Sequence, residues 1–261
     1  RYTAVPPPSF HQFPSSRIMF WHNKQPRTSR LKSILRHTAE DEHFKAYLCA
    51  RWQWSDPTFH SLAWKPYESA RLAAPLALQR FTTKHLVRWL PTKELLAKYD
   101  PNLSPQCPFC PQIETTSHVW SCPSRGGWRQ SFLHTLRDQL ISADTAPALQ
   151  QLIISGIDTY FTDTAGATKF DVPAFLVGLL PITWISLQSC HAKSPRSPPP
   201  PTGEKWCRRI VTFVWHATFD GWQERCTAAH NSDAPVRHQI IVSKIQQLYD
   251  KDSVLPPCDH A

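Results

Sequence analysis

The sequence predicts an all-α fold, an irregular helical bundle interrupted by Pro-rich disordered segments. Glycine is scarce, at 7 of 261 residues, which disfavours a turn-rich β fold. Apolar residues recur three and four positions apart through most of the chain, as they do on the buried face of a helix. Proline is abundant at 25 residues, but much of it clusters near the N-terminus and in residues 194–201, where it marks linkers.

Residues 1–28 are expected to form a disordered, basic and Pro-rich arm. The stretch has neither helical nor strand periodicity and combines Pro, Ser and scattered aromatic residues. Its cations include Arg17, Lys24 and Arg27. Such an arm either contacts phosphates or is an ordinary solvated tail, and the composition fits both readings.

Residues 29–162 are predicted to be a helical region. Thr38 followed by Asp41 is a capping signal, so we expect a helix to begin there and to continue to Arg51. A second helical stretch is predicted over residues 66–90, with Pro75 as a break or first-turn residue. Apolar stripes predict two further packing helices, at residues 128–140 and 149–160.

Residues 163–192 are predicted to form a loop followed by a buried, apolar helix pair. The run from residue 172 to 190 has no charged side chain, which is long enough to raise a membrane span as an alternative. Pro181 in the middle and the polar residues after it favour the kinked pair inside a protein core.

Residues 193–204 are predicted to be an extended Pro-rich linker. Residues 205–261 are expected to form a C-terminal helical pair. Its first helix carries a broad apolar stripe over residues 205–230, and the second places Ile241, Ile245 and Leu248 on one face.

The helical stretch before residue 90 carries a basic face. Arg80, Lys84 and Arg88 recur every four residues, so on one continuous helix they share a face about 80° wide. Phe81, His85 and Trp89 would form an adjacent stripe for packing. Such a helix can present cations to a phosphate backbone, or its polar face can simply be solvated.

A metal-ligand pattern follows this helix. Cys107, Cys110, His118 and Cys122 have the spacing Cys-x2-Cys-x7-His-x3-Cys. Two Cys separated by two residues on a tight turn present both sulfurs to one point, and a His and a Cys four apart project from one face of a helical turn. The sequence therefore predicts a small zinc knuckle over residues 107–122. Since protein side chains fill all four positions of the tetrahedron, the Zn²⁺ would be structural.

Other short motifs accompany the four ligands. An Arg-Phe pair (80–81) is followed by a Trp-Leu-Pro-Thr turn (89–92), a short helix (94–99) and a linker (100–105). A Cys-Pro-x-Cys turn (107–110), a Glu-Thr stretch (114–116), His118 and Cys122 complete the series. With this pattern the segment over residues 78–122 resembles the zinc-binding region downstream of the reverse transcriptase in non-LTR (LINE-like) retroelements. The chain departs from many relatives in having three residues, not four, between His118 and Cys122.

The resemblance implies a non-catalytic, zinc-dependent nucleic-acid-binding module in the C-terminal part of a reverse transcriptase polyprotein. The module would help the polymerase hold its template or target, and its partners would be RNA or DNA and the upstream reverse transcriptase domain. The first residue is Arg1, not Met, which suggests a piece of a longer polyprotein. The residues we expect to contact nucleic acid are Arg80, Lys84, Arg88, Lys93, Arg125 and Arg129.

Composition agrees with a polyanion partner without establishing one. The formal net charge is +9, and many proteins this basic bind no nucleic acid. Three of the eight Cys belong to the metal pattern, which leaves an odd number outside it. Thiolate ligands need a reducing compartment, so we expect an intracellular protein of the nucleus or cytoplasm.

The sequence holds no recognisable catalytic carboxylate motif. A polymerase or nuclease needs clustered carboxylates to hold its metal ions, and the chain has no Asp-Asp pair. Asp158, Asp163 and Asp171, with Lys169, are the nearest approach to such a cluster. Two alternatives to the nucleic-acid module therefore remain: a zinc-stapled helical protein-interaction module, and a metal-dependent endonuclease domain.

Overall fold

The computed structural model describes the backbone of residues 11–12, 18–22, 25–27, 31–162, 168, 170–192 and 202–252. Side chains are described for residues 42–162, 168, 170–192, 202–231 and 243. The chain divides into two compact units, residues 1–59 and 60–261, which are described separately. The fold is all-α, as the sequence predicted.

The first unit contains a long helix preceded by three short strands. The strands β1 (His11–Gln12), β2 (Ile18–His22) and β3 (Gln25–Arg27) pair antiparallel in the order β1-β2-β3. The sequence predicted no regular structure in this arm. β2 holds Ile18, Phe20 and Trp21, residue types that favour strands and that a search for long periodic runs passes over. The rest of residues 1–28 lies outside the described residues.

The helix α1 (Leu31–Trp52) begins well before the predicted start at Thr38. Thr38 and Asp41 lie in its interior, so the predicted capping signal was wrong. The helix ends where Gln53 takes a left-handed conformation (φ 57°). Lys45 of α1 pairs with Asp56 of α2 (Asp56–His60) at 2.6 Å.

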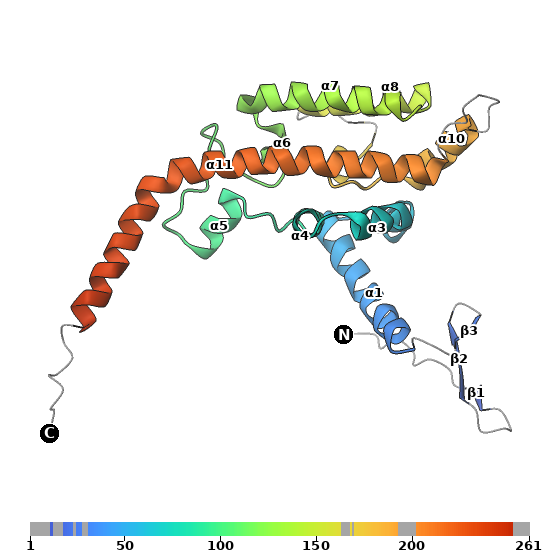
Figure 1. The fold of residues 1–261 in the computed structure, drawn as a ribbon, viewed down its shortest axis with the longest axis horizontal. Helices are drawn as coiled ribbons and strands as arrows, with labels where there is room; N and C mark the ends of the chain where they lie inside the picture. The colour runs from blue at the N-terminus through green and yellow to red at the C-terminus, as the bar shows by residue number, and fades with distance from the viewer. Residues whose placement is uncertain are drawn as a thin grey trace. The chain divides into compact units, whose positions relative to one another are not determined.

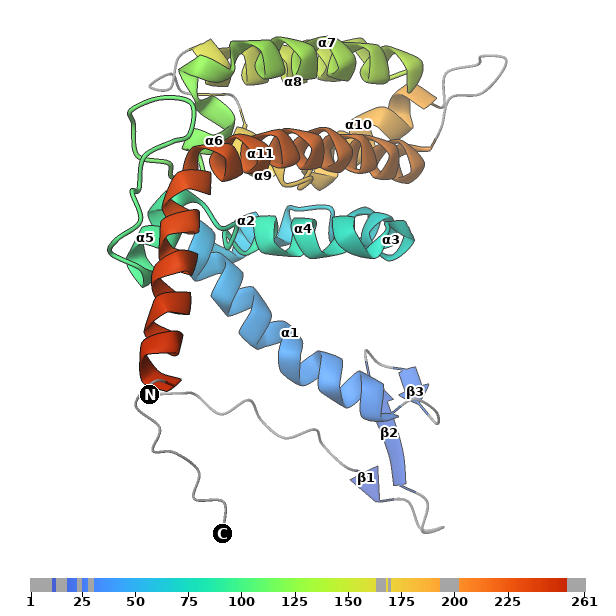
Figure 2. The same ribbon diagram turned by 60° about the vertical axis from the view of Figure 1, so that its left-hand side comes forward.

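The second unit is built around one long helix, α11. Figures 1 and 2 show it between a layer formed by α7 and α8 and a layer formed by α3 and α4. The elements in chain order are α3 (Trp64–Ala73), α4 (Leu76–Leu86), α5 (Lys93–Tyr99), α6 (His118–Ser121), the 3-10 turn η1 (Pro123–Arg125), α7 (Gly126–Ser142), α8 (Pro147–Thr162), α9 (Val172–Leu176), α10 (Ile182–Ala192) and α11 (Gly203–Asp252).

The core is centred on tryptophans of α11. Trp206 and Trp215 are fully buried, and each indole N–H has an acceptor: Thr145 Oγ1 at 2.8 Å and the Val177 carbonyl at 2.7 Å. Gly178 follows Val177 with φ +92°, and a Cβ there would lie 2.4 Å from Trp215 Nε1. The close approach of Trp215 therefore requires glycine at this position.

Two boundaries predicted between residues 66 and 190 agree with the helices. Pro75 separates α3 from α4, as predicted, and α9 and α10 occupy the uncharged run that ends at Cys190. Among the described residues no helix has the length and apolarity that a membrane span requires. The predicted loop over residues 163–170 falls almost entirely outside the described residues, as do residues 193–201 of the linker predicted over 193–204.

The predicted C-terminal helical pair is instead a single helix. α11 runs without a break from Gly203, inside the predicted linker, to Asp252. The stretch where we expected a turn contains Pro235, which lacks a backbone N–H, but no glycine follows Gly221, so the residue that most often ends a helix is missing there.

Candidate metal centre

The predicted ligands come from a loop and a short helix between α5 and α7. Gln106 and Ile113 pair as an isolated antiparallel bridge, and the Cys107 N–H donates to the Gln112 carbonyl at 2.8 Å. This tight hairpin carries Cys107 and Cys110. α6 begins at His118, whose N–H donates to Thr115 Oγ1 at 3.1 Å, and Cys122 follows its last residue.

The four side chains converge, as the spacing predicted. Their ligand atoms all lie within 4.8 Å of one another. Sγ of Cys122 is 3.8 Å from Sγ of Cys107 and 3.7 Å from Sγ of Cys110, and Cys110 Sγ lies 3.2 Å from His118 Nε2. Metal–sulfur bonds of 2.3 Å at a tetrahedral angle require an S···S separation of about 3.8 Å. Cys107, Cys110, His118 and Cys122 could therefore hold one metal ion.

The site is protected from solvent. Cys122 is fully buried and Cys107 is 8% exposed. Burial raises the pKa of the Cys122 thiol to about 12 and also raises that of Cys107, and it lowers the pKa of His118. The surroundings thus favour uncharged ligands, and only a bound cation would stabilise thiolates here.

A buried ion pair ties residues 107–122, called the metal loop below, to α11. Glu114, which is fully buried, accepts from Arg225 Nε at 2.7 Å, and its other oxygen contacts Arg225 Nη2. The same carboxylate accepts from the Lys93 backbone N–H at 2.6 Å, which attaches the start of α5. Three donors on one buried carboxylate satisfy its charge.

A second arginine anchors the other side of the loop. Arg125 is 3% exposed; its guanidinium donates to the Val119 carbonyl at 2.9 Å and to the Gly221 carbonyl at 2.7 Å. It also pairs with Glu224 at 3.2 Å and lies over the Trp128 ring. Arg125 therefore joins the metal loop to α7 and α11.

An aromatic contact attaches α4 to the ligand helix. Trp120, between the ligands His118 and Cys122, donates its indole N–H to His85 Nε2 at 3.1 Å. His85 is 2% exposed, and burial lowers its pKa to about 3, so it stays neutral and accepts this bond.

The predicted cation face on α4 is only partly present. Arg80 and Lys84 are exposed one turn apart. α4 ends at Leu86, and Arg88 takes a left-handed conformation (φ 54°), so it leaves the helical face and is half-buried. The packing stripe also stops early: Phe81 and His85 are buried, but Trp89 is 56% exposed.

Three of the predicted nucleic-acid contacts turn inward. Lys93 is 6% exposed and Arg125 is 3% exposed, so neither presents its charge on the surface. Arg129 donates to the Phe161 carbonyl at 2.5 Å and to the Pro123 carbonyl at 3.1 Å. The prediction for Lys93 and Arg125 is corrected by their burial, and Arg129 serves a structural role.

Sequence reasoning missed the residues that hold the loop in place. Glu114 was noticed only as part of a Glu-Thr stretch, and Arg225 was not singled out. The one available signal was an Arg inside the apolar stripe of α11, because a charge on a buried face requires a partner.

The possible carboxylate cluster is not assembled by the described residues. Asp158 is exposed on α8, and Asp171 caps α9 by accepting from the Ala174 N–H at 2.9 Å. Asp163 and Lys169 lie outside the described residues. Within the described part of the chain, the Cys and His cluster is the one group of potential metal ligands.

Comparisons with protein-family models, with curated proteins and with solved structures gave no match for this chain. Arguments about function therefore rest on the residues themselves.

Proposed function

We propose that the chain is a non-catalytic, zinc-stapled nucleic-acid-binding module from a retroelement reverse transcriptase polyprotein. The observation that carries the proposal is the convergence of three sulfurs and one imidazole within 4.8 Å, in the segment whose motif resembles that of non-LTR retroelements. In this proposal the module holds RNA or DNA for an upstream polymerase domain.

Zinc is the metal that suits this donor set. It accepts Cys and His ligands in a tetrahedron, and the closed four-ligand shell leaves no position for water or substrate. The ion would hold the hairpin and α6 together. The buried contacts of Glu114 and Arg125 would then transmit that order to α5, α7 and α11.

Nucleic acid is the partner that suits the exposed residues of α4 and of the turn that follows it. The exposed cations Arg80 and Lys84 and the exposed indole of Trp89 lie within ten residues of one another. Cations can contact phosphates while an aromatic ring stacks on a base.

The test measures metal and nucleic acid on the same purified chain. Mass spectrometry should find one zinc per chain, lost when Cys110 and His118 are both replaced by alanine. Fluorescence anisotropy should find binding to labelled RNA or DNA oligonucleotides that weakens as salt rises, because each phosphate contact releases condensed counterions. Absence of zinc, or an affinity that does not change with salt, would overturn the proposal. Incubation with nucleic acid and Mg²⁺ or Mn²⁺ tests its non-catalytic part, since cleavage lost on an Asp substitution would favour an endonuclease.

A protein-interaction module is the second candidate. Leu72 and Leu76, beside the break at Pro75, are 66% and 61% exposed, and Tyr99 is 77% exposed. Large apolar side chains at the surface favour protein partners. Binding to oligonucleotides that is undetectable at low salt would favour this candidate.

A further inference from the structure

The exposed side of α11 carries a second basic face that the sequence analysis did not identify. Lys205, Arg208, Arg209, Thr212 and His216 follow the spacing of one helical face about 100° wide. All but Thr212 are exposed, and the stretch is about 16 Å long at 1.5 Å per residue. This set is called the α11 basic face below.

A groove runs beside the α11 basic face, where α7 packs on α11. It encloses about 580 Å³ and is lined by all five residues of that face, together with Gln139 of α7 and Phe213 of α11. Phe213 is half-buried, with its inner side against Phe132 at 6.2 Å between ring centroids. The rest of the ring faces the groove, so an aromatic surface lies among cations.

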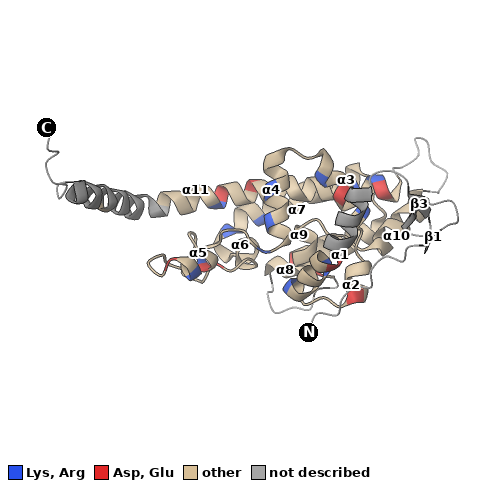
Figure 3. Cartoon of the chain, turned by 90° about the horizontal axis from the view of Figure 1, so that it is seen from below, with Lys and Arg blue, Asp and Glu red and all other residues tan. Residues whose placement is uncertain are grey.

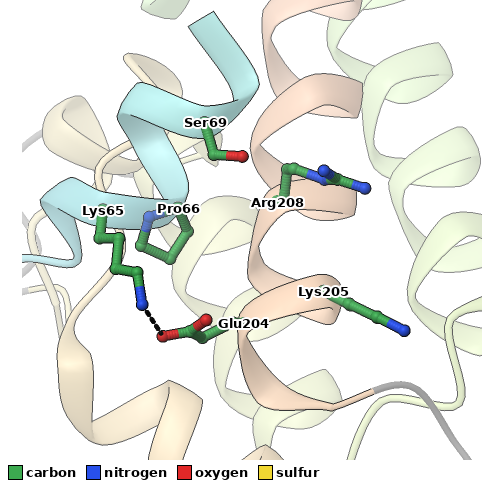
Figure 4. A pocket seen from close by; sticks show the side chains of 6 residues that line it. All are labelled: Lys65, Pro66, Ser69, Glu204, Lys205 and Arg208. Carbon is green, nitrogen blue, oxygen red and sulfur yellow. Dashed lines mark hydrogen bonds and ion pairs between the residues drawn. The ribbon is translucent and has the colours of Figure 1, made fainter. Parts of the chain in front are cut away.

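A smaller hollow of about 130 Å³ lies on the other side of the same residues, between α3 and α11. Figure 4 shows Lys205 and Arg208 extending from α11 in the same direction, while Glu204 turns to Lys65. The Lys65–Glu204 distance is 3.2 Å, so the one carboxylate that lines the two hollows already has a cation. Lys205 and Arg208 belong to both hollows.

The cations of this face are positioned but largely uncompensated. Arg209 donates to the Ser142 carbonyl at 3.1 Å and to Ser142 Oγ at 2.8 Å, neutral groups that orient it without removing its charge. Within the described part of the chain, no carboxylate pairs with Lys205 or Arg208. After Glu204, the next acidic residues on the exposed side of α11 are Asp220 and Glu224, beyond the basic face. Lys and Arg are blue and Asp and Glu red in Figure 3.

Cations that line a groove and an aromatic ring between them are the features that bind single-stranded nucleic acid. The cations follow the phosphates, and the ring stacks on a base of any identity. A duplex keeps its bases stacked on one another and would use only the cations. Resting on the nucleic-acid function proposed above, we propose that the groove between α7 and α11 binds the backbone of single-stranded RNA or DNA, with Phe213 contacting a base.

The experiment compares three double variants of the full chain by fluorescence anisotropy with a labelled single-stranded oligonucleotide. Lys205→Gln/Arg208→Gln removes two charges from the groove, and Arg80→Gln/Lys84→Gln removes two from α4. Lys98→Gln/Arg137→Gln removes two exposed charges that line neither hollow. Circular dichroism and thermal unfolding should be alike for all three, because the changed residues are exposed.

We expect the groove variant to lose about tenfold in affinity and its salt slope to fall by about 1.4, which corresponds to two phosphate contacts on a single strand. The Lys98/Arg137 control should bind like the wild type. If that control loses as much as the groove variant, net charge explains the effect and the proposal is overturned. If only the Arg80/Lys84 variant loses affinity, the groove is overturned but nucleic-acid binding stands. A wild-type chain that binds no oligonucleotide would overturn both.

Phe213→Leu tests whether the groove binds single-stranded nucleic acid in preference to a duplex. The variant keeps an apolar side chain against Phe132 and removes the aromatic surface. Its affinity for a single strand should fall several-fold, and its affinity for a duplex should stay unchanged, since only unpaired bases are free to stack on the ring. An unchanged single-strand affinity, or an equal loss for the duplex, would overturn the assignment.

Discussion

The part of α11 whose side chains are described, residues 203–231, uses arginine in opposite ways at its two ends. At residues 205–216 the cations point outward beside a groove, whereas Arg225, some three turns further on, is 4% exposed and is held by the buried carboxylate of Glu114. The helix is the same and the residue type is the same. The difference comes from what packs against each end, which shows that a cation's role is set by its neighbours in the fold.

The largest effect that bears on this comparison should come from the metal ligands. Cys122→Ser replaces a fully buried sulfur, whereas Cys190→Ser, an exposed cysteine outside the cluster, is the matched control. If zinc holds the loop, Cys122→Ser should abolish stoichiometric zinc and greatly lower the free energy of unfolding, because structural zinc contributes about 10 kcal/mol or more in isolated zinc-binding peptides. Metal analysis and urea unfolding measure both. Equal zinc content and equal unfolding free energy of the two variants would show that no metal ion stabilises the metal loop.

The same substitution at both ends of residues 203–231 of α11 tests the comparison directly. Arg225→Gln leaves Glu114 buried without its charged partner and should lower the free energy of unfolding by about 3–5 kcal/mol. Arg208→Gln changes an exposed residue and should shift it by no more than about 0.5 kcal/mol. Urea denaturation of the two variants gives both numbers. Similar values would mean that the two ends are not distinguished by burial.

His85, which contacts Trp120 of the metal loop, should make the free energy of unfolding depend on pH. Burial lowers the pKa of His85 to about 3, while an unfolded His titrates near 6.5. Below pH 6.5 the unfolded chain takes up a proton that the folded chain does not. The free energy of unfolding should therefore fall by about 1.4 kcal/mol per pH unit as the pH drops from 6.5 towards 3, and this contribution is fully present above 6.5.

His85→Gln is the variant that isolates this effect, since its side-chain carbonyl can accept the Trp120 N–H. Its free energy of unfolding should fall less steeply than that of the wild type between pH 6.5 and 5. The metal site and the carboxylates are common to both proteins, so the difference in slope reports His85 alone. Parallel slopes would show that His85 binds protons alike in the folded and unfolded chains, so that burial does not lower its pKa.

Features encoded by short stretches could be predicted from the sequence. The helices of the second unit follow local periodicity. Pro75 separates two of them because its missing N–H and its ring disfavour a helix interior, whatever the tertiary contacts. The four ligands converge because their spacing is itself a local geometric constraint. By contrast, the start of α1 and the continuity of α11 were missed. Local signals such as Thr38 only favour a boundary, and tertiary packing can override them; α11 continues even through Pro235.

The roles of the cations could not be predicted from position along the chain. Lys93 and Arg125 flank the metal motif in sequence, but both are buried, and Arg125 donates to the Gly221 carbonyl of α11. The basic groove depends on the pairing of α7 with α11, more than sixty residues apart in the chain. Charge near the motif was therefore a poor guide to which cations lie on the surface.

The link between Glu114 and Arg225 joins residues 111 positions apart. During synthesis Glu114 leaves the ribosome many seconds before Arg225, at translation rates of about 5–20 residues per second. Until then its carboxylate must stay hydrated, since a buried charge without a partner is too costly. The hairpin therefore docks only when α11 is made, whether or not it has already bound a metal ion, and the C-terminal third of the chain completes assembly.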